Sequence, residues 1–181
     1  MSPSLEGTNL NDCGDEFRCV VVDPPWRYRD GLPGPRRGAE SHYPCLSLAE
    51  IEDLVRRQLT DAAPDAHLYC WTTNAFMPEA WRLCELWDFT PRTILTWVKP
   101  SIGMGHYYRN NTEHVVFAVR GTLPTLQKDQ PTAFFAPRLL HSEKPAEFFR
   151  IVERMSPGPR LELFARKPRE GWTVWGNEVN V

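Results

Sequence analysis

Several features that mark familiar classes of protein are missing from this 181-residue sequence. Its five cysteines never occur at C-x-x-C spacing, which argues against a structural zinc site. No apolar run approaches the length that spans a membrane. No signal peptide precedes the odd number of cysteines, which fits reduced thiols in a cytoplasm. The absence of an internal repeat also excludes a solenoid or propeller.

An excess of positive charge is missing too. Lys and Arg total 21 against 23 Asp and Glu, for a net charge of −2. A nucleic-acid partner is therefore not indicated by global charge and would need a local basic patch. The hydrophobic content of 41% is ordinary for a globular protein. We expect residues 1–15 to form a flexible, polar N-terminal segment and residues 16–181 to form a single domain.

Helical and strand patterns alternate along this domain. The expected strands are Phe17–Val22, Ala66–Trp71, Arg92–Val98, Glu113–Val119, Leu161–Ala165 and Trp172–Trp175, with a short extended piece at Phe134–Phe135. The expected helices are Leu48–Leu59 behind a capping box at Ser47, Pro78–Trp87 and Pro145–Met155. This alternation predicts an α/β fold with a mostly parallel sheet and helices on both of its faces.

The stretch from Val20 to Trp26 carries the strongest chemical signal. Three valines make a short buried strand, which ends in Asp23, Pro24, Pro25 and Trp26. Ligands collect at the carboxyl ends of such strands. A carboxylate, rigid prolyl carbonyls and a flat indole together provide a way to hold a planar amine. The structural alternative is a proline-rich turn in which Asp23 caps the strand and Trp26 belongs to the core.

Two loops combine basic and aromatic residues. The loop at residues 27–46 carries Arg27, Arg29, Arg36 and Arg37 with Tyr28, His42 and Tyr43 between them. The loop at residues 101–112 carries His106, Tyr107, Tyr108 and Arg109, and Lys99 lies just before it. This composition is typical of phosphate contact combined with base stacking. The alternatives are solvated loops and, for Lys99, plain exposure at a strand end.

The Asp-Pro-Pro-Trp stretch closely resembles the catalytic motif of the METTL-type (MT-A-type) adenine-N6 methyltransferases. The resemblance continues through HLYCWTTN, RTILTWVKP and GHYYRNNTEHVVFAVRG, and through the segment from His141 to Glu178. It implies a Rossmann-like methyltransferase fold that uses S-adenosylmethionine. The Phe-x-Gly-x-Gly loop of many other amino-methyltransferases is replaced by LFAR, as in the METTL type.

The resemblance also implies a set of cofactor-binding residues. Lys144 would contact the methionine carboxylate of S-adenosylmethionine, Arg166 its ribose region, and Asn177 with Glu178 its adenosine portion. Glu162 belongs to the same expected set, and Asp23 would contact the cofactor's amino group, the target N6, or both. The structural alternatives are an exposed Lys144, an ion pair between Arg166 and Glu162, and an Asn177 that caps a strand end.

The expected chemistry needs no metal ion. A carboxylate and a prolyl carbonyl would accept the two N–H groups of adenine and direct its lone pair toward the methyl group. A duplex target would have to be flipped out and stacked on Trp26 or Tyr43. The substrate-binding residues that we expect are Trp26, Arg27, Arg36, Arg37, Tyr43, Lys99, His106, Tyr108 and Arg109.

Three functions remain open at this point. The favoured one is adenine-N6 methylation of DNA by a cytoplasmic enzyme, monomeric or homodimeric and without a membrane partner, from a bacterium or a phage-infected cell. The frequent Arg, Pro and Ala residues favour such a source. The alternatives are adenine-N6 methylation of RNA and an inactive, methyltransferase-like scaffold that binds nucleic acid. Methylation of a protein side-chain amide is weaker still, because Asn-Pro-Pro-Tyr is the usual motif for that reaction.

Overall fold

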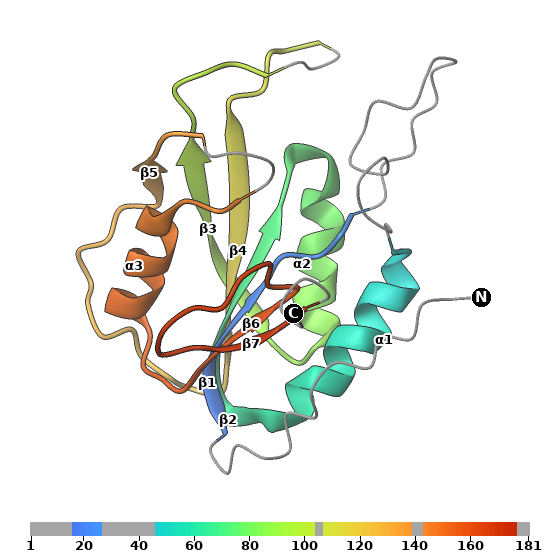
Figure 1. The fold of residues 1–181 in the computed structure, drawn as a ribbon. Coiled ribbons are helices and arrows are strands. Elements are labelled where there is room, and N and C mark those ends of the chain that lie inside the picture. The colour runs from blue at the N-terminus through green and yellow to red at the C-terminus, as the bar shows by residue number, and fades with distance from the viewer. Residues whose placement is uncertain (1–15, 27–45, 104–106, 139–142, 177–181) are drawn as a thin grey trace.

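The computed structural model describes residues 16–26, 46–103, 107–138 and 143–176, which form a sheet flanked by helices (Figure 1). The sheet has seven strands in the order β5-β3-β4-β2-β1-β6-β7. Only the two pairings that involve β4 are antiparallel. The expectation of a mostly parallel sheet with flanking helices is confirmed. Within the described ranges, no helix is long and apolar enough to cross a membrane.

The elements follow the expected order closely. The strands are β1 Phe17–Val22, β2 Ala62–Thr72, β3 Thr90–Val98, β4 Thr112–Arg120, β5 Ala133–Phe135, β6 Arg160–Leu163 and β7 Thr173–Trp175. The helices are α1 Leu48–Gln58, α2 Met77–Leu86 and α3 Ala146–Met155, and short 3₁₀ turns lie at Leu59–Asp61 and Asn74–Phe76. The capping box of α1 is confirmed, because Ser47 and Glu50 exchange both hydrogen bonds.

Among the strand boundaries that differ from expectation, the start of β2 and the end of β6 have identifiable reasons. Strand β2 begins at Ala62, before Pro64, because an irregularity in its pairing with β1 accommodates the proline: Phe17 pairs with Ala62 but Cys19 already pairs with His67. Strand β6 ends at Leu163 because the next residue, Phe164, has a φ of 62° and turns the chain. Pro145 occupies the N-cap of α3 instead of its first helical position.

The alternation of side chains along the strands produces two cores, one on each face of the sheet. Val20 and Val22 pack with residues of α1 and α2, whereas Cys19 and Val21 pack with residues of α3. Figure 1 shows α3 on one side of the sheet and α1 with α2 on the other. Helices therefore cover both faces of the central strands, which leaves the ends of the strands as the place where a ligand can bind.

The topology brings four distant residues to one edge. Asp23 and Lys99 follow the carboxyl ends of β1 and β3, and Glu113 is the second residue of the antiparallel β4, which begins at that same edge. These residues continue the alternation of Val21, Trp97 and Val115, so they point to the face covered by α3. Lys144 lies just before α3 and reaches the same place.

Candidate active site

The turn that carries the Asp-Pro-Pro-Trp motif is held by backbone hydrogen bonds on both sides. The Asp23 N–H donates to the Leu163 carbonyl at 3.4 Å, which ties the motif to the end of β6. The Leu46 N–H donates to the Pro25 carbonyl at 3.2 Å, and the Trp26 N–H donates to the Pro24 carbonyl at 2.9 Å. With two prolines fixing φ, the Asp23 carboxylate projects from a rigid turn.

Four charged side chains form a continuous chain of ion pairs at this edge, which we call the carboxyl-edge network. Lys144 Nζ lies 3.0 Å from Asp23 Oδ2 and 3.5 Å from Glu113 Oε2. Lys99 Nζ lies 2.5 Å from Glu113 Oε1. All four side chains are largely buried, and Lys144 is the most buried with 14% of its side chain exposed. The charges therefore alternate from Lys99 through Glu113 and Lys144 to Asp23.

The two central ions, Lys144 and Glu113, are stabilised in their charged forms by their partners. Burial by itself lowers the pKa of Lys144, but the carboxylates of Asp23 and Glu113 outweigh it and hold that pKa above its ordinary value. Burial by itself raises the pKa of Glu113, but Lys144 and Lys99 together hold it below its ordinary value. Lys144 also lies 4.7 Å from the ring centroid of Trp71, which favours its cationic form.

Asp23 and Lys144, which the resemblance assigned separately to the cofactor, are thus in contact with each other, and the alternative of an exposed Lys144 is wrong. The ammonium of Lys99 is turned to Glu113 and lies 4.7 Å from the Trp97 ring, so the alternative of plain exposure is wrong and substrate contact by Lys99 stays a prediction. Glu113 is a site residue to which the sequence analysis gave no function. The sequence feature that could have identified Glu113 is its position as a charged residue near the start of a strand that becomes buried from Val115.

Trp26 requires a correction. Its side chain is 7% exposed, its Nε1–H donates to the Trp71 carbonyl at 3.1 Å, and its ring stacks on Phe76 with centroids 5.2 Å apart. The structure therefore contradicts the expectation that Trp26 stacks on a flipped base. The structural alternative is the correct one, since Trp26 anchors the motif in the core between β2 and α2.

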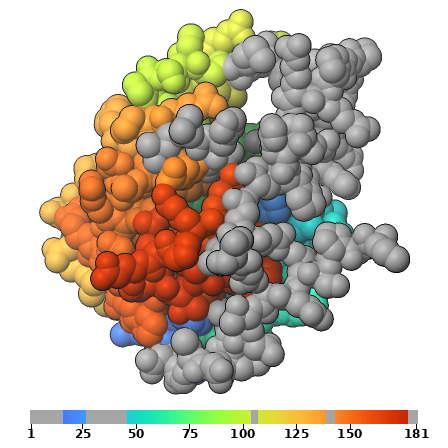
Figure 2. Space-filling model, viewed as in Figure 1, coloured from blue at the N-terminus to red at the C-terminus, as the bar shows by residue number. Residues whose placement is uncertain are grey.

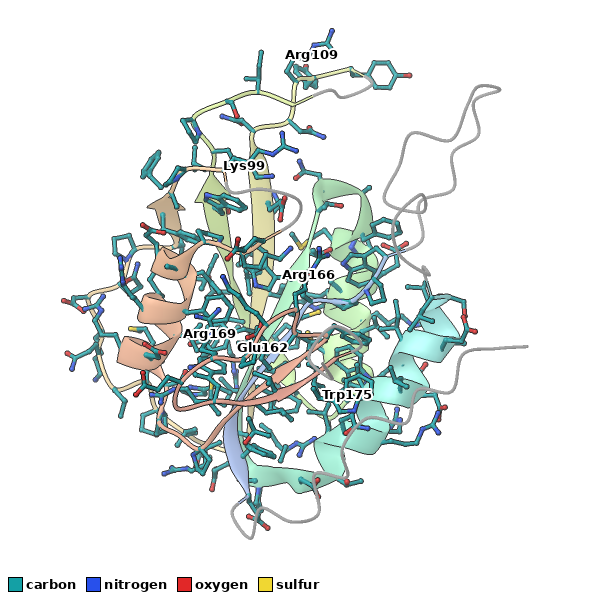
Figure 3. The ribbon with its side chains drawn as sticks, viewed as in Figure 1. Lys99, Arg109, Glu162, Arg166, Arg169 and Trp175 are labelled. Carbon is teal, nitrogen blue, oxygen red and sulfur yellow. The ribbon has the colours of Figure 1, made fainter. Side chains whose placement is uncertain are left out.

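Glu162 and Arg166 both lie near the network, and the structural alternative gave Arg166 as the ion-pair partner of Glu162. Glu162 Oε2 instead lies 3.5 Å from Arg169 Nε, and the Arg169 guanidinium lies 3.2 Å from the Phe149 ring centroid. Burial raises the pKa of Glu162, and Arg169 offsets only part of that rise. Figure 3 shows Glu162, Arg166 and Arg169 in one region of the α3 face.

Electrostatic effects connect these residues to the carboxyl-edge network. The charges of Asp23 and Lys144 act on the pKa of Glu162, and the Arg166 guanidinium opposes part of the rise in the pKa of Lys144. Asp23, Lys144, Glu162 and Arg166 therefore share one site, which contains both cations and anions.

The remaining expected site residues are placed differently. Tyr108 and Arg109 are exposed on the connection between β3 and β4, beyond the strand ends (Figure 3). Seven others lie outside the described residues: Arg27, Arg36, Arg37, Tyr43, His106, Asn177 and Glu178. Among the residues that the structure does describe, no cluster of three or more His, Cys, Asp and Glu side chains could hold a metal ion.

Comparison with known proteins agrees with this arrangement. The family model of MT-A70 matches residues 17–178, nearly the whole chain. The chain belongs to the MT-A70 family. Its sheet and helices therefore form the Rossmann-like fold of the MT-A70 methyltransferases, which use S-adenosylmethionine.

Individual relatives of this MT-A70 chain come from bacteria and animals. It is 29% identical to the type II methyltransferase M.MunI of Mycoplasma sp, with 91% of this chain and 78% of that protein aligned. It is 28% identical to the mouse N(6)-adenine-specific methyltransferase METTL4 and 27% identical to the human N(6)-adenosine-methyltransferase catalytic subunit METTL3. The chain spans 39% and 28% of these two proteins. The METTL-type resemblance expected from the sequence is confirmed.

Proposed function

We propose that this chain transfers a methyl group from S-adenosylmethionine to the N6 amine of adenine in DNA. The observation that carries the proposal is the position of Asp23, whose carboxylate projects from a rigid turn at the strand edge with Oδ2 held 3.0 Å from Lys144. The other carboxylate oxygen can then accept a hydrogen bond from an exocyclic amine.

The backbone of the same turn provides a second acceptor. The Pro24 carbonyl accepts the Trp26 N–H, and a carbonyl oxygen has a further lone pair for a second donor. Adenine N6 is a weak nucleophile because its lone pair is delocalised into the ring. Two acceptors fixed on one rigid turn would orient both N–H groups and direct the lone pair toward the incoming methyl group, so the rate would come from orientation and electrostatics.

The mixed charges of the site fit the cofactor. S-adenosylmethionine supplies a methyl group on a sulfonium, and the same molecule carries an ammonium, a carboxylate and ribose hydroxyls. Lys144 would hold the carboxylate, Asp23 and Glu162 suit its cationic groups, and Arg166 suits the ribose. The buried Trp71 Nε1–H has no hydrogen-bond partner among the described residues and adds an unused donor on this face.

The choice of DNA over RNA rests on the relatives. M.MunI, named as a type II methyltransferase, shares 78% of its length with this chain. The METTL3 protein, named for adenosine, shares 28%. An inactive scaffold is disfavoured because the Asp23 carboxylate and its Lys144 partner are both present and in contact. Arg27, Arg36, Arg37 and Tyr43 stay predicted substrate contacts, and a cytoplasmic monomer or homodimer stays a prediction.

A methyl-transfer panel tests the proposal. Matched DNA and RNA oligonucleotides, single-stranded and duplex, each with one adenine, are incubated with labelled S-adenosylmethionine, and the modified nucleoside is identified. We expect N6-methyladenine in DNA at the highest initial rate. Faster labelling of RNA would move the assignment to the RNA alternative. Labelled cytosine, or cofactor binding without any transfer, would overturn the proposed reaction.

A further inference from the structure

The connection between β3 and β4 carries two aromatic side chains into solvent. Tyr107 is 98% exposed and Tyr108 is 86% exposed. The pairing of the two strands continues past the sheet, because the Lys99 N–H donates to the Asn111 carbonyl at 2.7 Å and the Gly103 N–H donates to the Asn110 carbonyl at 2.6 Å. The described residues of this hairpin extension therefore lie beyond the carboxyl edge of the sheet (Figures 2 and 3).

The two tyrosines do not support the fold that carries them. Neither makes a hydrogen bond or a ring contact with any described residue, unlike Tyr69, which is buried and hydrogen-bonded. A single exposed aromatic needs no explanation, but here Ile102, 69% exposed, adds a third large apolar side chain to the same short segment. The extension thus presents apolar and aromatic surface that folding does not use.

The charge of the extension indicates what that surface meets. The sequence from Pro100 to Thr112 contains Arg109 but no Asp or Glu, although the whole chain has a net charge of −2, and Lys99 before it is already paired with Glu113. Two aromatic side chains next to an arginine, in a segment with no acidic residue, suit a polyanion that also has flat, stackable groups. That combination describes an unpaired stretch of nucleic acid better than it describes a protein surface.

We propose that Tyr107 and Tyr108 form a stacking subsite for an unpaired nucleobase of the substrate, separate from the site of methyl transfer. The inference rests on the proposed function, since it assumes that the carboxyl edge receives a nucleic acid. The extension begins at Lys99, which contacts Asp23 through Glu113 and Lys144, so the two sites share one edge. The base would be a neighbour of the target in a single strand or the partner left behind by a flipped adenine.

Binding measurements with matched variants test the subsite. Fluorescence anisotropy follows a labelled single strand with one adenine, and the same strand with abasic sites flanking that adenine. The Tyr107→Ala/Tyr108→Ala double variant should bind the intact strand roughly 5- to 150-fold more weakly, as expected for lost stacking on one base. Tyr107→Phe/Tyr108→Phe, which keeps both rings, should bind within about twofold of the unsubstituted protein, as should Leu126→Ala, an exposed apolar control after β4.

A second pair of probes identifies which base is stacked. If the flanking base occupies the subsite, the loss in the Ala variant disappears on the strand with flanking abasic sites. If the orphaned partner occupies it, the loss disappears on a duplex with an abasic site opposite the adenine. The inference is overturned if the Ala and unsubstituted proteins bind every probe equally, if the Phe variant binds as weakly as the Ala variant, or if the tyrosines change only the oligomeric state in sedimentation.

Failure of the proposed function is distinguishable from failure of this inference. Strand binding is measured without cofactor, so the variants can be compared even if the unsubstituted protein transfers no methyl group. Binding of S-adenosylhomocysteine to each variant, expected to be unchanged, reports on the transfer site independently.

Discussion

The face of the sheet beneath α3 holds two buried polar clusters, one made of charged side chains and the other of neutral side chains. The carboxyl-edge network consists of four ions: Lys99, Glu113, Lys144 and Asp23. The second cluster, which we call the amino-edge network, lies toward the other end of the strands and is uncharged. It joins His67 and Tyr69 on β2 to Ser156, which follows α3.

The hydrogen bonds of the amino-edge network run in one direction. His67 Nε2 lies 3.0 Å from the Leu123 carbonyl, which can only accept, so this nitrogen carries the proton. His67 Nδ1 therefore accepts from the Ser156 hydroxyl at 2.7 Å, and Ser156 Oγ accepts from the Tyr69 hydroxyl at 2.8 Å. Burial lowers the pKa of His67 and so keeps it neutral.

The difference shows how stability and function are divided along the strands. Neutral groups with fixed partners satisfy one another at little cost, so the amino-edge network serves the fold. Ions are expensive to bury even when paired, and one broken pair leaves an uncompensated charge. A chain of four such ions at the strand edge is therefore better explained by exchange of partners with a charged ligand than by stability.

The largest expected effect separates catalysis from folding. Asp23→Asn keeps the shape of the side chain but weakens the acceptor for the amine, so kcat for methyl transfer should fall by roughly 10²- to 10³-fold. Lys144 retains Glu113 as a partner, so the variant should still fold, and a thermal midpoint measured alongside separates the loss of kcat from a loss of stability. Asp53→Asn, in an exposed ion pair of α1, is the control. A kcat within threefold of the unsubstituted value would remove Asp23 from the mechanism.

In the amino-edge network, a substitution is expected to lower stability and to leave kcat unchanged. Ser156→Ala leaves both His67 Nδ1 and the Tyr69 hydroxyl without their partner, which should lower the free energy of unfolding by about 2–4 kcal/mol. Thermal unfolding should show a midpoint roughly 5–15 °C lower, with kcat unchanged at temperatures where the protein is folded. Ser101→Ala, at an exposed position, should leave the midpoint unchanged. If Ser156→Ala lowered kcat as much as Asp23→Asn does, the two networks would not differ in function.

Lys144 tests whether the carboxyl-edge network binds the cofactor. Lys144→Met removes the cation but keeps much of the apolar side chain, so the affinity for S-adenosylhomocysteine should fall by roughly 10- to 100-fold, equivalent to about 1–3 kcal/mol. Calorimetry measures it, and Lys128→Met at an exposed position is the control. DNA affinity should change much less, and unchanged cofactor affinity would contradict the role carried over from the family.

The smallest expected effect is a dependence of stability on pH. The pKa of His67 is lower in the folded chain than its ordinary value of 6.5, so the unfolded chain binds more protons as the solution is acidified. The stability contributed by neutral His67 is present above about pH 6.5 and is lost as the pH falls through its folded pKa. Denaturant midpoints between about pH 7.5 and 5.5 should therefore fall on acidification.

A His67→Asn variant should show a shallower fall across the same range. Both proteins need a His114→Asn background, because burial also lowers the pKa of His114. Identical slopes with and without His67 would show that the amino-edge network does not titrate.

The sequence by itself determined the elements and the motif. Valine runs, capping residues and prolines act on their immediate neighbours, so β1, the capping box of α1 and the rigid turn at Asp23 were all predictable. The family resemblance, carried by residues in a shared order, assigned both Lys144 and Asp23 to the cofactor site, and the structure shows these two distant residues in contact.

Only the tertiary structure decided which side chains meet. The insertion of the antiparallel β4 between β3 and β2 brings Glu113 to the carboxyl edge, where it joins Lys99 to Lys144. Trp26 was misassigned because a motif specifies a residue type but not what covers it, and the covering ring, Phe76, lies far along the chain. Contacts between distant segments depend on strand order and on the direction of each side chain, and neither property is encoded in local patterns.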